Sequence, residues 1–228
     1  PGGAASVRDA CRNAFALLSE LGLLGTQVPL GLDSLGEQTR SVTATMIERG
    51  INSPRTSSMG RLFDAAAAIL GICGQATYEA NPPSSSKPPL GVHWTAKSPI
   101  FPTTTPAFRI WPIVLDGPDV LDQKALFEAL LGEIEAGAPA DRLALDFHAA
   151  VARSSARIAS DICVRELDTV ALSGGVFMNR LLLQLLTREL KSAGLTVLVP
   201  HTVPVNDGCI AYGQAAVASA RLAQIASQ

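Results

Sequence analysis

Two glycine-containing segments in the last third of the chain have residue types that can bind a nucleotide. Ser173-Gly174-Gly175 follows an apolar run, and residues 204–208 read PVNDG. Glycines let backbone N–H groups come close to a ribose or phosphate, and the start of a following helix favours negative charge. Asn179, early in the predicted helix, offers amide donors and an acceptor. Nucleotide contact is one interpretation of the glycines, but spacing alone favours a simple turn between a strand and a helix.

Asp207 in the second segment could bind a cation or cap the last helix, and without further ligands capping is favoured. The three histidines, His93, His148 and His201, form no HxxxH pair. We expect His148 to pack between helices, because it lies in the middle of a predicted helix. No complete metal site can be assembled from the sequence. No catalytic residue is predicted either, because no Ser/His/Asp or Cys/His set is recognisable and no cysteine has a basic neighbour that would stabilise a thiolate.

A third candidate is Asp64, which lies with Arg61 in the stretch SSMGRLFDAAAAILG at residues 57–71. Ser57 and Ser58 can cap a helix that begins there. The apolar residues around Asp64 indicate that this helix packs into the core. Asp64 is then either a partly buried functional carboxylate or an exposed position on the helix.

The elements that would position the two glycine segments are predicted to form a parallel βαβ unit. We predict a strand at 169–172, a helix at 177–193 that Gly194 ends, a strand at 195–199 and an alanine-rich helix at 210–225. Strands and helices that alternate with short joints are typical of a parallel sheet. Ligands of such units bind beyond the carboxyl ends of the strands, where both glycine segments would lie.

The preceding part of the chain is predicted to be mostly helical. Apolar residues at three- and four-residue steps predict helices at 7–21, 35–49 and 59–70, each followed by a glycine. Seven of the fifteen prolines fall between residues 82 and 106, which indicates an irregular connection. A strand at 108–115 and helices at 123–136 and 140–166 follow, with Pro139 near the start of the last helix. The predicted division is a helical segment at 1–80, a Pro/Ser/Thr-rich connection at 81–107 and an α/β lobe at 108–228.

Length and composition limit the possible classes of protein. The 228 residues fit one large domain or two small ones, and 47% hydrophobic residues suffice for a substantial core. A net charge of −2 argues against recruitment of nucleic acid or an anionic membrane. We expect no membrane span or secretory leader, because no apolar run reaches about 18 residues and the start has no basic region. Four scattered cysteines are expected to be free thiols, which predicts a cytoplasmic protein.

Three separated segments resemble the carboxy-terminal part of the HypF family, the carbamoyltransferases of nickel–iron hydrogenase maturation. They are SPRTSSMGRLFDAAAAILG, VALSGGVFMNRLLLQLL and VPVNDGCIAYGQAAVA. The opening PGGAASVRDACRNAFALL is similar to the segment that enters this region. More distantly, the chain resembles the Kae1 type of tRNA threonylcarbamoyl transferases and antibiotic O-carbamoyltransferases. The resemblance implies an α/β fold, namely the carboxy-terminal lobe of an actin/Hsp70-like (ASKHA) ATPase fold with added helices.

The resemblance also implies a role for the matching residues. Five of them would bind ATP or carbamoyl-adenylate: Gly60, Asp64, Gly174, Gly175 and Asn179. Gly60 and Asp64 would lie against the adenosine end, and the other three would hold the nucleotide from the opposite side. Asp207 would be one ligand of a divalent zinc- or iron-like ion, a Lewis acid that orients phosphates and polarises the acyl group. The carbamoyl group would pass to the carboxy-terminal cysteine of a partner, HypE.

The chain departs from the family pattern in two ways. The metal-binding histidines and several other regions of HypF lie upstream of the first matching segment. After residue 80, NPPSSSKPPL replaces a helix that contributes to nucleotide recognition in HypF-type sequences, and these prolines cannot continue a helix. We therefore expect an incomplete nucleotide and metal site that is completed by docking to the missing amino-terminal part.

Two alternatives come from the same observations. One is a carbamoyltransferase of the Kae1-like family that acts on another acceptor, a small-molecule hydroxyl or a tRNA adenosine. The other is a lobe without catalytic function that only docks a partner. The docking lobe should expose an apolar face, because actin-like lobes normally bury such a face against each other.

Overall fold

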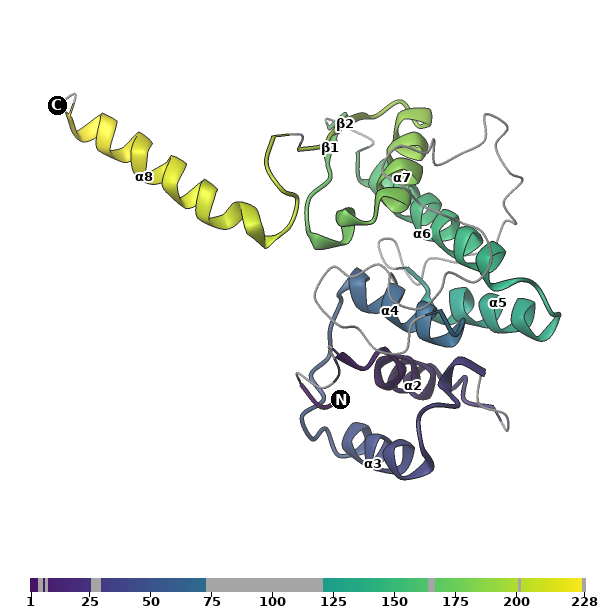
Figure 1. The fold of residues 1–228 in the computed structure, drawn as a ribbon. Coiled ribbons are helices and arrows are strands. Elements are labelled where there is room, and N and C mark those ends of the chain that lie inside the picture. Colours follow the sequence, from purple (N-terminus) through teal and green to yellow (C-terminus); the bar gives the residue numbers. More distant parts are fainter. Residues whose placement is uncertain are drawn as a thin grey trace.

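The computed structural model of the chain describes residues 1–3, 6, 8–25, 30–72, 121–163, 167–200 and 202–226. The elements that position the site are, in chain order, α2 (Ala10–Leu21), η1 (Leu30–Leu32), α3 (Glu37–Glu48), α4 (Met59–Ile69), α5 (Gln123–Glu135), α6 (Ala140–Ile162), β1 (Thr169–Ala171), η2 (Gly175–Met178), α7 (Arg180–Ser192), β2 (Thr196–Leu198), η3 (Asp207–Cys209) and α8 (Ile210–Ala226). Figure 1 shows α2, α3 and α4 grouped at the amino-terminal end and the small sheet with α6 and α7 at the other. The predicted connection at 81–107, the strand at 108–115, His93 and His201 lie outside the described residues, so the predicted domain boundaries stay a prediction.

The amino-terminal helices form where their caps and apolar spacing predict. The Asp9 carboxylate accepts a hydrogen bond from the backbone N–H of Arg12 at 3.3 Å, so α2 begins at Ala10 and not at residue 7. Gly22 ends α2 in the left-handed conformation, with φ of 69°. The buried face of α2 packs against α4 and, less extensively, against α3.

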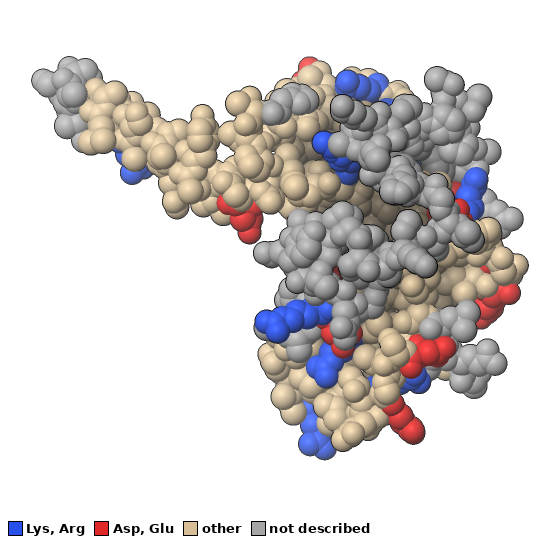
Figure 2. Space-filling view, viewed as in Figure 1, with Lys and Arg blue, Asp and Glu red and all other residues tan. Residues whose placement is uncertain are grey.

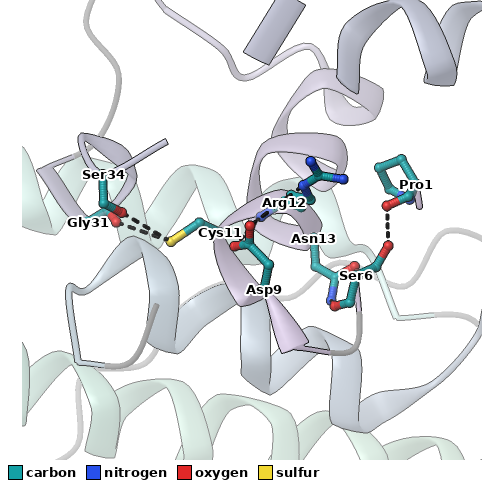
Figure 3. A network of polar contacts seen from close by, with 8 residues as sticks. All are labelled: Pro1, Ser6, Asp9, Cys11, Arg12, Asn13, Gly31 and Ser34. Atoms are coloured by element: carbon teal, nitrogen blue, oxygen red, sulfur yellow. Dashed lines mark hydrogen bonds and ion pairs between the residues drawn. The ribbon is translucent and has the colours of Figure 1, made fainter. Parts of the chain in front are cut away.

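The η1 turn is fastened between α2 and the end of α4. The Cys11 thiol lies 3.6 Å from the carbonyl oxygen of Gly31 and 3.7 Å from the Ser34 hydroxyl, as Figure 3 shows. On its other side, Gly31 contacts the backbone at the carboxyl end of α4 so closely that no side chain fits there. Cys11, Cys163 and Cys209 are free thiols, which confirms that expectation for the described cysteines.

One buried hydroxyl on α3 has a testable effect on stability. Thr43 is fully buried, and among the described residues its Oγ1 has no hydrogen-bond partner. A hydroxyl buried in this way carries a desolvation penalty, so Thr43→Val should raise the free energy of unfolding by about 1 kcal/mol. Urea unfolding would measure the change. In the control Thr45→Val the exposed hydroxyl bonds the Ser41 carbonyl at 3.0 Å, so no gain is expected, and equal gains in both variants would contradict the prediction.

Three aromatic side chains connect the two ends of the molecule. Phe147 on α6 packs edge-on against Phe63 of α4, with ring centroids 5.4 Å apart, and against Phe127 of α5 at 5.7 Å. Phe127 and Phe147 are both essentially inaccessible to solvent. The helix α6 therefore lies at the centre of the core, with α5 and α7 packed against it.

The predicted βαβ unit is confirmed. β1 and β2 pair in parallel, with Val170 opposite Val197, and α7 connects them. The predicted start of the helix at residue 177 is wrong by three residues. Residues 175–178 form the 3₁₀ turn η2, and α7 begins only at Arg180, because the Asn179 side chain accepts a hydrogen bond from the N–H of Leu182 at 3.1 Å and caps the helix.

The last helix, α8, extends away from the rest of the molecule, as Figure 1 shows in yellow. Its described side chains are all exposed, including those of Ile210, Tyr212, Val217 and Leu222. Figure 2 shows that this arm carries few charged groups. None of the described helices combines the length and the apolar character that crossing a membrane requires.

Candidate functional site

The two glycine segments lie side by side at the carboxyl edge of the sheet. The N–H of Leu172 donates to the carbonyl oxygen of Leu198 at 2.9 Å and continues the pairing of the strands. Beyond it, the N–H of Gly174 donates to the carbonyl oxygen of Val205 at 2.8 Å. The structure therefore brings residues 173–175 and 204–208 together at the edge that the sequence predicts.

Gly174 has a backbone conformation that requires glycine. Its φ is 111° and its ψ is 157°, a region that other residues avoid because of their Cβ atom. Gly175 has no such requirement, and a Cβ atom there would only reach van der Waals distance, 4.0 Å, from Asn206. The turn interpretation thus explains Gly174, whereas Gly175 is exposed and leaves the backbone at the loop surface open to a ligand.

Asn179 is held by two hydrogen bonds at the end of this loop. Its Oδ1 caps α7, and its Nδ2 lies 2.8 Å from Nε2 of His148 on α6. His148 packs between elements as predicted, because its ring also lies 4.7 Å from the ring of Phe63 on α4. Burial lowers the pKa of His148, while its hydrogen bonds to Ala144 and Asn179 act in the opposite direction.

The α4 helix contributes the other two predicted nucleotide residues. α4 contacts η2, so the helix that carries Gly60 and Asp64 adjoins the glycine loop. The Asp64 carboxylate is half-exposed and pairs with Arg61 at 3.2 Å. Burial raises the pKa of Asp64, and Arg61 lowers it in part. A side chain at Gly60 would meet only the Ser58 hydroxyl, at 3.6 Å, so this turn of the helix is open.

Asp207 is exposed at the beginning of η3, and the expectation that it caps the last helix is wrong. Asn206 takes the capping role, since its Oδ1 accepts a hydrogen bond from the N–H of Gly208 at 3.2 Å, and η3 runs directly into α8. Within the described ranges, no group of three or more His, Cys, Asp or Glu side chains could hold a metal ion. Asp207 on its own offers one carboxylate, so the described residues do not form a metal site.

A second surface feature lies outside this cluster. An open and mostly apolar depression runs along α7 to the end of β2, where its described lining is Leu183, Gln184, Thr187, Arg188, Lys191, Ser192 and Val199. None of the six predicted site residues borders it. The candidate site that the predicted residues define is the glycine loop with α4, and it is separate from this depression. The glycines and Asp64 indicated this candidate site in the sequence. The hydrogen bond between Asn179 and His148, which are 31 residues apart, had no signal in the sequence.

The fold defines the class of protein. Two solved structures match almost the whole chain with a TM-score of 0.72. One is full-length HypF in a phosphate- and nucleotide-bound form, 24% identical, with 97% of this chain and 28% of that chain covered. The other is HypF from T. kodakarensis, 25% identical, with 98% and 29% covered. The chain has the α/β fold of a lobe of the actin/Hsp70-like class, as predicted.

Residues 1–214 match the family model of the second subdomain of the Kae1-like domain of carbamoyltransferases, and the chain belongs to this family. A carbamoyltransferase HypF homolog of Cupriavidus necator is 37% identical over 223 residues, which are 96% of this chain and 55% of that protein. HypF2 of the same organism is 34% identical over 97% of this chain and 29% of its own length. HypF of Rhodobacter capsulatus is 33% identical over 80% and 22%. The chain thus spans about half or less of these relatives.

Proposed function

We propose that the chain is the carboxy-terminal part, or a separate carboxy-terminal subunit, of a cytoplasmic HypF-type carbamoyltransferase and forms one wall of its nucleotide site. The observation that carries this proposal is the contact between α4, the helix that carries Gly60 and Asp64, and η2, the turn between Gly174 and Asn179. ATP or carbamoyl-adenylate would lie over this contact. Asp64 would accept hydrogen bonds from the adenosine end, and the backbone around Gly175 would approach the nucleotide from the other side.

The proposed reaction transfers the carbamoyl group to the carboxy-terminal cysteine of a HypE-type protein. The thiolate attacks the carbonyl carbon of carbamoyl-adenylate, a C–S bond forms, and AMP leaves with the electrons of the C–O bond. This chain's share is to bind and orient the nucleotide. A divalent zinc- or iron-like ion would supply Lewis-acid chemistry when bound. Asp207 would contribute one carboxylate, and the other ligands would come from the amino-terminal part of the enzyme.

The docking surface for that amino-terminal part is proposed to include α8. The helix exposes apolar residues along its length and has a single charged residue, Arg221. Exposed apolar surface of this extent is typical of an interface. The same observation favours the alternative of a docking lobe without catalytic function. A Kae1-like carbamoyltransferase with another acceptor would use the same nucleotide wall, and no described residue distinguishes the acceptors.

The first test is calorimetric titration of the chain with ATP, with and without a divalent metal. We expect saturable binding that Asp64→Ala weakens about ten-fold, since a hydrogen bond to a charged group is lost. Asp161→Ala is a matched control, because Asp161 has similar exposure, 50% against 45%, and a comparable ion pair with an arginine. Equal losses in both variants would contradict the assignment of Asp64.

If the folded chain alone does not bind ATP, a second titration distinguishes a nucleotide half-site from a docking lobe without catalytic function. The chain is co-purified with the amino-terminal part of a HypF relative and titrated again. ATP binding that needs both parts, and that Asp64→Ala weakens, indicates a half-site completed by docking. Co-purification without ATP binding indicates the docking lobe and overturns the nucleotide proposal.

A further inference from the structure

The ring of His148 on α6 contacts residues of α4 and of the start of α7, the two helices beside the glycine loop. Its Nδ1 lies 2.6 Å from the carbonyl oxygen of Ala144, one turn earlier on α6. Its Nε2 lies 2.8 Å from Nδ2 of Asn179 at the start of α7. Phe63, which precedes Asp64 on α4, packs on the ring at 4.7 Å between centroids. A displacement of the ring would therefore change both the cap of α7 and the position of α4.

These contacts determine which ring nitrogen carries the proton. A backbone carbonyl can only accept, so Nδ1 of His148 must donate to Ala144. In the neutral ring Nε2 is then the acceptor, and the Asn179 amide must turn its N–H₂ group toward it. The other end of that amide accepts the N–H of Leu182. Both ends of Asn179 are committed, so its amide has one orientation.

We propose that neutral His148 is a positioning residue that fixes the Asn179 amide and so couples the glycine loop to α4. This inference rests on the proposed nucleotide function, which gives Asn179 and Asp64 a common ligand. One N–H of Asn179 is not used by His148 and can meet that ligand. If the amide were reversed, its oxygen would lie opposite Nε2 of His148. The N–H of Leu182 would then lose its acceptor, and α7 would lose its cap.

Protonation of His148 would force that reversal. An imidazolium has N–H groups at both nitrogens, so Nε2–H would face the N–H₂ group of Asn179. The charged residues on the elements around the ring are Arg61 and Asp64 of α4, Asp141, Arg142, Asp146, Arg153, Arg157 and Asp161 of α6, and Arg180, Arg188, Glu189 and Lys191 of α7. The described part of the chain contains no ion pair between His148 and any of them; Arg61 pairs with Asp64 and Arg142 with Asp146.

The stability of the chain should depend on pH through this ring. The pKa of folded His148 lies below the ordinary 6.5 because burial disfavours the charged ring. The contribution of the neutral His148 ring to the free energy of unfolding is therefore complete above pH 6.5. It is lost as the pH falls through the folded pKa, because the unfolded chain then binds more protons than the folded chain. Urea unfolding at about pH 7.5 and about pH 5.5 should show a smaller loss for His148→Gln than for the wild-type chain.

The direct test is an NMR titration of the histidine nitrogens in the full chain, with the His148 signal assigned from its absence in His148→Phe. We expect Nδ1 of wild-type His148 to carry the proton. Asn179→Asp keeps a cap for α7 but places a carboxylate at Nε2, so it should raise the pKa of His148 above its ordinary value. Asn206→Asp is the control, because Asn206 caps η3 and should leave the titration unchanged. Protonation at Nε2, or a titration that Asn179→Asp does not move, overturns the inference.

ATP affinity then separates this inference from the function on which it rests. His148→Phe should weaken ATP binding about three- to ten-fold, the value of one hydrogen bond, while His148→Gln keeps an acceptor for Asn179 and most of the affinity. If the titration behaves as expected but wild-type chain and both variants show no ATP binding even with the amino-terminal part present, the positioning role stands and the nucleotide function fails. If ATP binds and His148→Phe keeps at least as much affinity as His148→Gln, the hydrogen bond to Asn179 does not matter and the proposal is wrong.

Discussion

Replacing Gly31 by alanine should lower the free energy of unfolding by about 3 kcal/mol, near the upper end of typical overpacking effects. A Cβ atom at this position would lie 1.8 Å from the carbonyl oxygen of Ala68, 2.7 Å from that of Ile69 and 2.8 Å from the nitrogen of Gly71. All three atoms belong to the backbone, so no side-chain rotation can relieve the contact. The η1 turn would have to separate from the end of α4.

The measurement is urea unfolding of Gly31→Ala beside Gly132→Ala. Gly132 lies within α5, and a Cβ atom there would meet nothing within 4 Å. Alanine is favoured over glycine inside a helix, so the control should gain about 0.5–1 kcal/mol. If Gly31→Ala is as stable as Gly132→Ala, η1 does not rest on α4 in the way described.

Periodic apolar spacing and glycine stops were sufficient to predict most of the described fold. The helices at 35–49, 59–70 and 123–136 lie within two residues of α3, α4 and α5. α4 and α5 each bury one apolar face, whereas α3 buries Thr43 and ends just before Gly50. The helix start at 177 was missed for a physical reason. Phe177 and Met178 are apolar like the leucines that follow and carry no turn signal, but Asn179 is a good cap, and capping moved the start to Arg180.

The location of the candidate site was predictable from the sequence, but the contacts within it were not. Parallel strands bring their carboxyl ends to one edge, so the proximity of Gly174 to residues 204–208 follows from the βαβ pattern. The hydrogen bond between Asn179 and His148 depends on how α6 packs against α7, and tertiary packing leaves no short-range pattern in the sequence. Asn206 and Asp207 are both good caps, and only the geometry of η3 shows that Asn206 has this role.

Gly174→Ala should lower the free energy of unfolding by about 1–3 kcal/mol, because only glycine adopts this backbone conformation without strain. The cause is the conformation alone, since a Cβ atom at Gly174 would meet nothing within 4 Å. The neighbouring Gly175→Ala is the matched control. Its φ is not positive and its Cβ atom has room, so it should change stability by less than about 0.5 kcal/mol.

The two variants also test whether each glycine is needed for the fold, for ligand binding or for both. If the loop only turns the chain, Gly174→Ala loses stability and Gly175→Ala changes neither stability nor ATP affinity. If the proposed nucleotide wall is right, Gly175→Ala keeps its stability but weakens ATP binding, because the added methyl group stands on the exposed surface that the nucleotide would approach. Unfolding and titration of these two variants therefore separate the turn requirement at Gly174 from the ligand requirement at Gly175.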